Sequence, residues 1–149
     1  ATPPFSATGY FSARQARETV ELLKAAGDEG LFRVVMIHHP PIRGAAASHK
    51  RMIGIRRFAA AIAMGGAELV LHGHTHLNTL YWLDAHGKRV PVVGIASASQ
   101  GPGAPKPPAG YNLFSISGEA GAWKLKWDRY GLFDDAVNLR HEHHQFLLG

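Results

Sequence analysis

The stretch "AELVLHGHTHLNTL", residues 67–80, decides how this chain is interpreted. It begins as a short run of aliphatic residues, which is typical of a buried strand, and we predict a strand over residues 67–73. Three histidines, His72, His74 and His76, then alternate along the chain. In an extended segment, side chains two residues apart point to the same side, so His74 and His76 are expected to lie together.

A second apolar run, "FRVVMI" at residues 32–37, predicts another buried strand. It stops at "HHPP", because two prolines cannot continue a ladder of hydrogen bonds. The segment between the two strands, residues 52–66, has the pattern of a helix. In α/β sheets, ligands bind beyond the carboxyl ends of the strands, so His38 is expected beside His74 and His76. Three imidazoles can hold a divalent transition metal such as Zn, Mn, Fe or Ni.

Two further histidines belong to these strand ends. His39 is the candidate catalytic residue, expected either to support a metal-binding histidine or to contact substrate. His72 precedes a glycine and is expected to be packed at the strand end. A lone pair of histidines would be taken as an ordinary hydrogen-bonded surface pair, but histidines at the ends of two neighbouring strands favour a metal site.

The other predicted elements place these strands in an α/β fold. Residues 1–11 are expected to be extended or loop. An amphipathic helix is predicted over residues 12–27, since Ser12 and Gln15 have capping-box spacing and Gly27 is a suitable stop. Residues 79–99 predict two strands around a turn at residues 84–87.

The C-terminal third is expected to be antiparallel. Residues 100–110 form a Pro/Gly-rich loop, which is either a lid over substrate or a plain connector. Residues 111–131 predict a hairpin in which Trp123, Leu125 and Trp127 alternate. The tail, residues 132–149, has no clear hydrophobic periodicity. Its "RHEHH" is interpreted mainly as a segment that binds adventitious metal during purification. Short helices between buried strands, followed by hairpins, predict the α/β class.

Composition narrows the choice of partners. The net charge is +5, which suits anionic ligands, but the basic residues form no run and are not interleaved with aromatics, so no nucleic acid is expected. The chain has no cysteine, which excludes disulfides and thiolate metal sites. No apolar run reaches transmembrane length and no export signal is visible, so a cytoplasmic protein without a membrane partner is expected.

Two motifs together carry a resemblance to a known family. "MIHHPP" at residues 36–41 and "LVLHGHTH" at residues 69–76 resemble the calcineurin-like metallophosphoesterase superfamily, in particular its bacterial branch of phosphodiesterases acting on cyclic nucleotides and glycerophosphodiesters. The resemblance implies two divalent metal ions (Mn, Fe, Zn or Co) and a bridging hydroxide that attacks a phosphodiester. It implies that His38 and His74 bind the second metal and His76 the first.

Half of that family's ligand motifs are missing. Asp-x-His occurs only as Asp84–His86, which we interpret as a turn, and Gly-Asp-x-x-Asp and Gly-Asn-His do not occur. Residues 1–149 are therefore expected to be the C-terminal part of a single metallophosphoesterase domain, an αββα sandwich. The expected partners are the missing N-terminal half and a small phosphodiester, with a homo-oligomer as a further option.

Two interpretations of function stay open. In the first, the complete domain is a metal-dependent phosphodiesterase and this chain alone is inactive. In the second, the chain is a non-catalytic binding or assembly module derived from the same fold. Arg43 and His49 are the expected substrate-binding residues in the first case, although a solvated basic face is the simpler interpretation of the cluster to which they belong.

Overall fold

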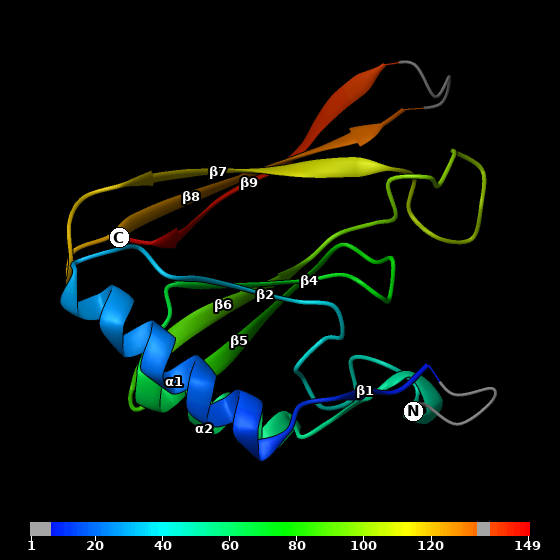
Figure 1. Ribbon diagram of the computed structural model, residues 1–149. Coiled ribbons are helices and arrows are strands. Elements are labelled where there is room, and N and C mark those ends of the chain that lie inside the picture. The colour runs from blue at the N-terminus through cyan, green and yellow to red at the C-terminus, as the bar shows by residue number, and fades with distance from the viewer. Residues whose placement is uncertain (1–6, 134–137) are drawn as a thin grey trace. The chain divides into compact units, whose positions relative to one another are not determined.

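A computed structural model describes residues 7–133 and 138–149 of the chain (Figure 1). The α/β class is confirmed, because helices and strands alternate in the first half and strands alone follow. The chain divides into two compact units. The first contains the residues up to Thr75 together with Leu80–Val93, and the second contains His76–Thr79 and Gly94–Gly149. None of the described helices has the length and apolar character that a membrane span requires.

The elements follow one another in an order close to the predicted one. They are β1 (Gly9–Tyr10), α1 (Ala13–Asp28), β2 (Val34–Ile37), the short 3-10 helix η1 (Ser48–Lys50), β3 (Met52–Ile53), α2 (Ile55–Gly65), β4 (Leu69–His72), β5 (Thr79–Ala85), β6 (Lys88–Gly94), β7 (Gly110–Ser117), β8 (Lys124–Leu132) and β9 (Leu139–Leu148). The strands form three sheets, with the orders β1-β3, β2-β4-β6-β5 and β7-β8-β9.

The helix α1 begins as the sequence predicts. The Ser12 side chain accepts a hydrogen bond from the backbone N–H of Gln15 at 3.1 Å, and the Gln15 side chain accepts one from the backbone N–H of Ser12 at 2.8 Å. This reciprocal pair is the capping box. The predicted stop at Gly27 is wrong by one residue, because the left-handed turn after the helix is taken by Gly30, with φ 70°.

Replacing Ser12 by alanine is expected to destabilise the first unit by about 1 kcal/mol, because a backbone N–H at the start of α1 loses its acceptor. Urea unfolding followed by circular dichroism at 222 nm measures the change. Ser12→Asp is the control, since aspartate also caps helices. Equal losses for alanine and aspartate would contradict the capping explanation.

The second helix starts later than predicted. Residues 52–66 were expected to be helical throughout, but Met52 and Ile53 form β3 and pair in parallel with Gly9 and Tyr10 of β1. The backbone turns into α2 at Gly54, which has φ 98°. A side chain at Gly54 would collide with the carbonyl oxygen of Phe11, so close backbone packing fixes the start of the helix.

One face of the four-stranded sheet packs on the two helices and forms the main core of the first unit. Strands β2 and β4 are parallel, with Val35 opposite Val70 and Ile37 opposite His72. These residues share the helix-covered face. The buried members of this core are Phe11, Leu23, Met52, Phe58, Ala61, Ile62, Ala67, Val70, Leu83, Ala85, Val90 and Val92.

The prediction that residues 32–37 form a buried strand is wrong for one face of β2. Met36 is 81% exposed and Val34 is 42% exposed. Within the described part of the chain, β2 pairs only with β4 and is therefore an edge strand. By contrast, β4 is flanked on both sides and is mostly buried, as predicted.

The predicted turn between β5 and β6 is confirmed. His86 and Gly87 both have positive φ, 54° and 83°, which is the backbone of a tight hairpin turn. The Asp84 carboxylate accepts a hydrogen bond from the backbone N–H of Gly87 at 3.2 Å. The Asp-x-His sequence at this position is therefore held as a turn.

The second unit is built on an antiparallel sheet of three strands. The hairpin predicted over residues 111–131 is confirmed as β7 and β8, and Leu125 and Trp127 are almost fully buried. The tail without a clear period forms β9, which pairs with β8. The predictions for residues 1–6 and 134–137 lie outside the described residues.

Candidate metal centres

The parallel pairing of β2 and β4 brings two of the predicted metal-binding histidines together. His38 directly follows β2, and the backbone N–H of Gly73, just after β4, donates to the His38 carbonyl oxygen at 3.1 Å. Nε2 of His38 and Nδ1 of His74 are 3.0 Å apart. The two imidazoles therefore meet at the carboxyl ends of neighbouring strands, as the sequence predicts.

The spacing between these two nitrogens fits a shared metal ion. Zinc–nitrogen bonds of 2.0–2.1 Å place two ligands of one ion about 2.9–3.4 Å apart, for bond angles between octahedral and tetrahedral. A metal would replace the hydrogen bond between His38 and His74 without separating the rings. His38 is exposed and His74 is half-buried, so an ion can reach the pair from solvent.

The segment that carries His74 and His76 is not extended. Both residues have left-handed backbones, with φ 60° and 56°, and the N–H of Thr75 donates to the carbonyl oxygen of Gly73 at 2.7 Å. The expectation that extended backbone places both side chains on one side is therefore wrong. The structure groups His74 with His38 in the first unit, whereas His76 is exposed and belongs to the second unit.

His39 packs against both histidines of the pair. Its ring centroid lies 4.2 Å from that of His74 and 5.0 Å from that of His38. Its Nε2 donates to the carbonyl oxygen of Ala7 at 2.7 Å, and its ring lies where Gly9 has no side chain. This position suits a residue that orients the other two imidazoles.

His72 is a packed residue, as expected. It is 5% exposed, lies on the helix-covered face of β4 and stacks on Tyr81 at a centroid distance of 6.4 Å. Burial lowers the pKa of His72, because the charged imidazolium loses water, while its hydrogen bond to the Gly73 carbonyl oxygen acts in the opposite direction. The lowered pKa favours the neutral form of this buried imidazole.

The two predicted substrate-binding residues have different surroundings. Arg43 is exposed and lines a pocket of about 780 Å³ in the first unit, together with Arg51, Arg56 and Arg57. None of the described residues lining this pocket is acidic. The backbone carbonyl of His49 accepts hydrogen bonds from residues 7 and 8, and the residue is not part of the pocket lining.

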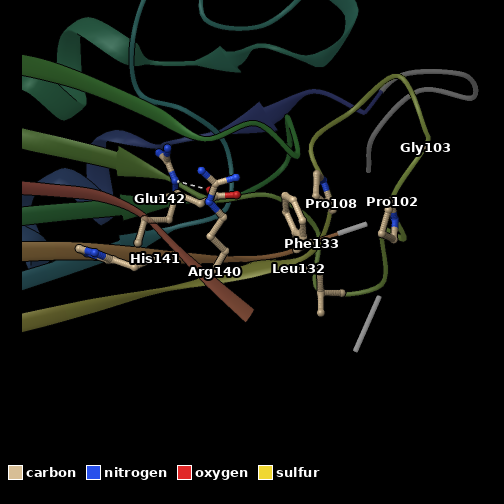
Figure 2. A pocket seen from close by; sticks show the side chains of 9 residues that line it. Pro102, Gly103, Pro108, Leu132, Phe133, Arg140, His141 and Glu142 are labelled. Atoms are coloured by element: carbon tan, nitrogen blue, oxygen red, sulfur yellow. Dashed lines mark hydrogen bonds and ion pairs between the residues drawn. The ribbon is translucent and has the colours of Figure 1, made fainter. Parts of the chain in front are cut away.

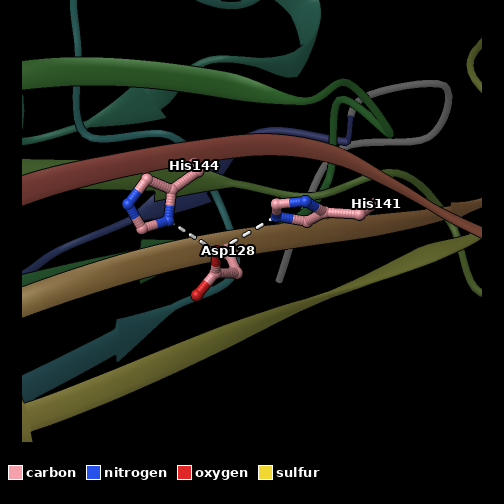
Figure 3. A group of neighbouring side chains, drawn as sticks. All are labelled: Asp128, His141 and His144. Carbon is pink, nitrogen blue, oxygen red and sulfur yellow. Dashed lines mark hydrogen bonds and ion pairs between the residues drawn. The ribbon is translucent and has the colours of Figure 1, made fainter.

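A second group of side chains that could hold a metal ion lies in the second unit, where the sequence pattern did not predict one. Asp128 of β8 and His141 and His144 of β9 each offer one ligand atom, and these atoms lie within 4.8 Å of one another (Figure 3). Among residues 7–133 and 138–149, this is the one group of three or more His, Asp or Glu side chains with that geometry. It is a possible metal site.

Asp128 is the centre of this group. The hydrogen bond from His144 lowers the pKa of Asp128 to about 2, against the opposing effect of burial, and Lys126 and His141 act in the same direction as His144. The carboxylate therefore carries a full negative charge at neutral pH. The only sequence signal for the group was the histidine-rich "RHEHH", which points to no partner on another strand.

The Pro/Gly-rich loop lines a pocket of about 580 Å³ beside the ends of β8 and β9 (Figure 2). The lining of this pocket also includes two arginines. One of them, Arg129, forms an ion pair with Glu142 at 3.0 Å. The other, Arg140, stacks on the Phe133 ring. The lining residues are Pro102, Gly103, Pro108, Arg129, Leu132, Phe133, Arg140, His141 and Glu142.

Comparison with known proteins gives structural likeness alone. No protein-family model matches the chain, and no curated protein matches it. Among solved structures it is similar to Vps29 from Entamoeba histolytica in complex with Zn²⁺, with 18% identity and a TM-score of 0.49 over 78% of this chain and 56% of that chain. A single mutant of the same protein gives 16% identity and a TM-score of 0.35, over 71% of this chain and 52% of that chain. A double mutant gives 11% identity and a TM-score of 0.36, over 90% of this chain and 94% of that chain. The chain spans about half the length of the first two structures.

Proposed function

We propose that this chain is a metal-binding module derived from the metallophosphoesterase fold, which binds one transition-metal ion at His38 and His74 and does not hydrolyse phosphoesters by itself. The observation that carries the proposal is the pairing of the two imidazoles at 3.0 Å. Within the described residues, no group of three metal-binding side chains includes either histidine.

The chemistry of the pair limits what it can do. Hydrolysis by a dinuclear centre requires ligands for two ions and a hydroxide held between them. Two neutral imidazoles provide neither the charge nor the number of ligands for that arrangement, but they suffice to hold one ion with water in its open positions. A module of this kind serves binding or assembly.

An anionic ligand is the partner that this module would take. Arg43, Arg51, Arg56 and Arg57 line one pocket without an opposing acidic residue among the described lining residues. Guanidinium groups bind phosphate in a bidentate manner, so a phosphate-bearing ligand suits the pocket. Such binding requires no catalysis.

Phosphodiester hydrolysis is the second candidate, supported by the two histidine motifs at neighbouring strand ends. In this case carboxylate ligands from an N-terminal half would complete a centre of two divalent ions, with His76 as a further ligand. Arg43 and His49 would then contact the phosphodiester, and His39 would orient the metal-binding imidazoles or contact the substrate.

One experiment tests the proposed metal-binding module. Zn²⁺ binding to the chain is measured by calorimetry, and turnover of bis(p-nitrophenyl) phosphate is followed with Zn²⁺ or Mn²⁺ present. We expect Zn²⁺ binding without turnover above the metal blank. His74→Asn is expected to remove one equivalent of bound Zn²⁺, because asparagine tolerates the left-handed backbone but lacks the imidazole.

The matched control is His86→Asn, which changes another histidine with positive φ in the β5–β6 turn. It is expected to leave the number of bound Zn²⁺ ions unchanged. Turnover by the chain alone would exclude the non-catalytic module. Full Zn²⁺ stoichiometry in His74→Asn would exclude the His38–His74 site.

A further inference from the structure

A bulge in β9 places two histidines on the same face of the three-stranded sheet. In a regular strand, residues three apart point to opposite faces, so His141 and His144 would be separated. In this sheet, His144 lies opposite Asp128 and His143 opposite Arg129, but Tyr130 lies opposite His141. Glu142 is thus the extra residue of the bulge.

The bulge reverses the order in which the side chains of β9 alternate between the two faces of the sheet. Asp128 and Tyr130 are two apart on β8 and share a face, so their partners His144 and His141 share it as well. His143 lies on the opposite face, where its ring is 4.6 Å from that of Trp127.

The bulged residue is held in place on that opposite face. The Glu142 carboxylate accepts a hydrogen bond from Nε of Arg129 at 3.0 Å. It occupies the space where Gly131 has no side chain, since a Cβ there would collide with the carboxylate. The contacts of Glu142 with Arg129 and Gly131 therefore stabilise the bulge between His141 and His144.

Both histidines aim a ring nitrogen at the same oxygen atom (Figure 3). Nδ1 of His144 lies 2.7 Å and Nε2 of His141 lies 3.0 Å from Oδ1 of Asp128. The other carboxylate oxygen, Oδ2, is paired with the Lys126 ammonium at 3.1 Å. Lys126 thus orients the carboxylate and leaves Oδ1 to the two imidazoles.

Ligand atoms that share a transition-metal ion lie about 2.9–3.4 Å apart for bonds near 2.0–2.1 Å. The 3.0 Å distance from His141 falls in that range, the 2.7 Å distance from His144 is slightly shorter, and all three ligand atoms lie within 4.8 Å of one another. The carboxylate side chain is 7% exposed, whereas each histidine side chain is 47% exposed. The point at which the three ligand atoms converge is therefore closed on the carboxylate side and open to solvent on the imidazole side. An ion can enter there and keep water molecules as its remaining ligands.

We propose that Asp128, His141 and His144 bind one divalent transition-metal ion as a two-histidine, one-carboxylate site with open coordination positions. The ligand set suits Zn, Co, Ni or ferrous iron, because imidazole with a single carboxylate is intermediate in softness. Each imidazole would coordinate the ion through the nitrogen that faces Oδ1, as the neutral tautomer whose proton lies on the other ring nitrogen. The site is independent of the pair at His38 and His74.

Co²⁺ titration of the full chain tests the proposal, in a His38→Gln, His74→Asn background that removes the other candidate site. Visible absorption reports the ligand field, and calorimetry with Co²⁺ counts the ions. We expect one bound ion with a nitrogen-containing ligand field. We expect the ion to raise the melting temperature, because it binds the folded state, and EDTA to reverse the rise.

His144→Gln and Asp128→Asn are each expected to weaken Co²⁺ binding by more than about a hundredfold, since even residues that only support metal ligands cost 10–100-fold. His143→Gln is the matched control, because it removes a neighbouring histidine on the opposite face of β9. It is expected to bind Co²⁺ normally. Circular dichroism confirms that each variant is folded before titration.

Two results would overturn the proposal. The first is unchanged Co²⁺ affinity in folded His144→Gln and Asp128→Asn, which would leave the group as a hydrogen-bond network. The second is an equal loss in His143→Gln, which would indicate nonspecific binding to a histidine-rich strand.

Discussion

Phe58→Ala is expected to destabilise the first unit by about 3–5 kcal/mol, the largest effect of any single substitution considered for the chain. Phe58 is 1% exposed in α2 and meets Phe11 edge to face, with ring centroids 5.3 Å apart. Its removal loses the transfer free energy of the ring and leaves a cavity between helix and sheet. The contact with Phe11 adds a smaller loss.

Urea unfolding monitored at 222 nm measures this change, because α1 and α2 both belong to the first unit and dominate the helical signal. Leu22→Ala is the matched control, since Leu22 is on α1 and 72% exposed, and its effect is expected to stay within about 0.5 kcal/mol. Phe58→Leu is expected to fall between the two. A Phe58→Ala loss no larger than that of Leu22→Ala would show that the core is not centred on this residue.

Glu68→Ala is expected to cost about 3 kcal/mol, because it leaves the Arg33 guanidinium without its counter-charge in a partly buried site. The two side chains form a bidentate pair, with Nη2 to Oε1 at 2.6 Å and Nε to Oε2 at 3.0 Å. Only 20% of the Arg33 side chain and 14% of the Glu68 side chain are exposed. The hydrogen bond to Glu68 raises the pKa of Arg33 above its usual value, so the arginine stays charged.

The pair also connects several elements. Nη1 of Arg33 donates to the carbonyl oxygen of Gly65 at 3.0 Å and to that of Leu23 at 3.4 Å. The guanidinium therefore caps the end of α2 and contacts α1 while Glu68 holds it at the start of β4. Loss of Glu68 loosens three elements at once, which is why the expected effect exceeds that of an ordinary ion pair.

Glu18→Ala provides the control for the Glu68 prediction. Glu18 and Arg14 are 2.7 Å apart, almost the same distance, but their side chains are 50% and 82% exposed. The expected loss is about 0.3–0.5 kcal/mol, as for other exposed helical pairs. A double replacement, Arg33→Met with Glu68→Leu, is expected to recover much of the lost stability, because no uncompensated charge remains. Equal losses for Glu68→Ala and Glu18→Ala would contradict the importance of burial.

Local features of the sequence predicted most elements correctly. Ser12 and Gln15 predicted the start of α1, and Asp84 with Gly87 predicted the turn between β5 and β6. These features depend on hydrogen bonds within a few residues of the chain, and such bonds form in the same way in any fold. The two histidine-bearing strand ends were predictable for a similar reason, since Pro40 and Gly73 interrupt the strands locally.

Features that depend on distant segments were missed. The helix predicted from residue 52 begins at Ile55, because β1 takes Met52 and Ile53 as its pairing partners. Met36 is exposed although its strand is apolar throughout, because it lies on the face of β2 opposite the helix-covered one. Neither the pairing partner nor the face that the helices cover is encoded in the neighbouring residues.

By itself, the sequence determined that His38 and His74 follow strands, because each apolar run and the proline or glycine that ends it lie within a few residues of one another. Only the tertiary structure decided which imidazoles meet: parallel pairing of β2 and β4 joins His38 to His74, and one extra residue in β9 joins His141 to His144 across Asp128. The physical reason is that a single residue of register reverses the face of every side chain beyond it. Register is set by contacts between strands, and those contacts exist only in the folded chain.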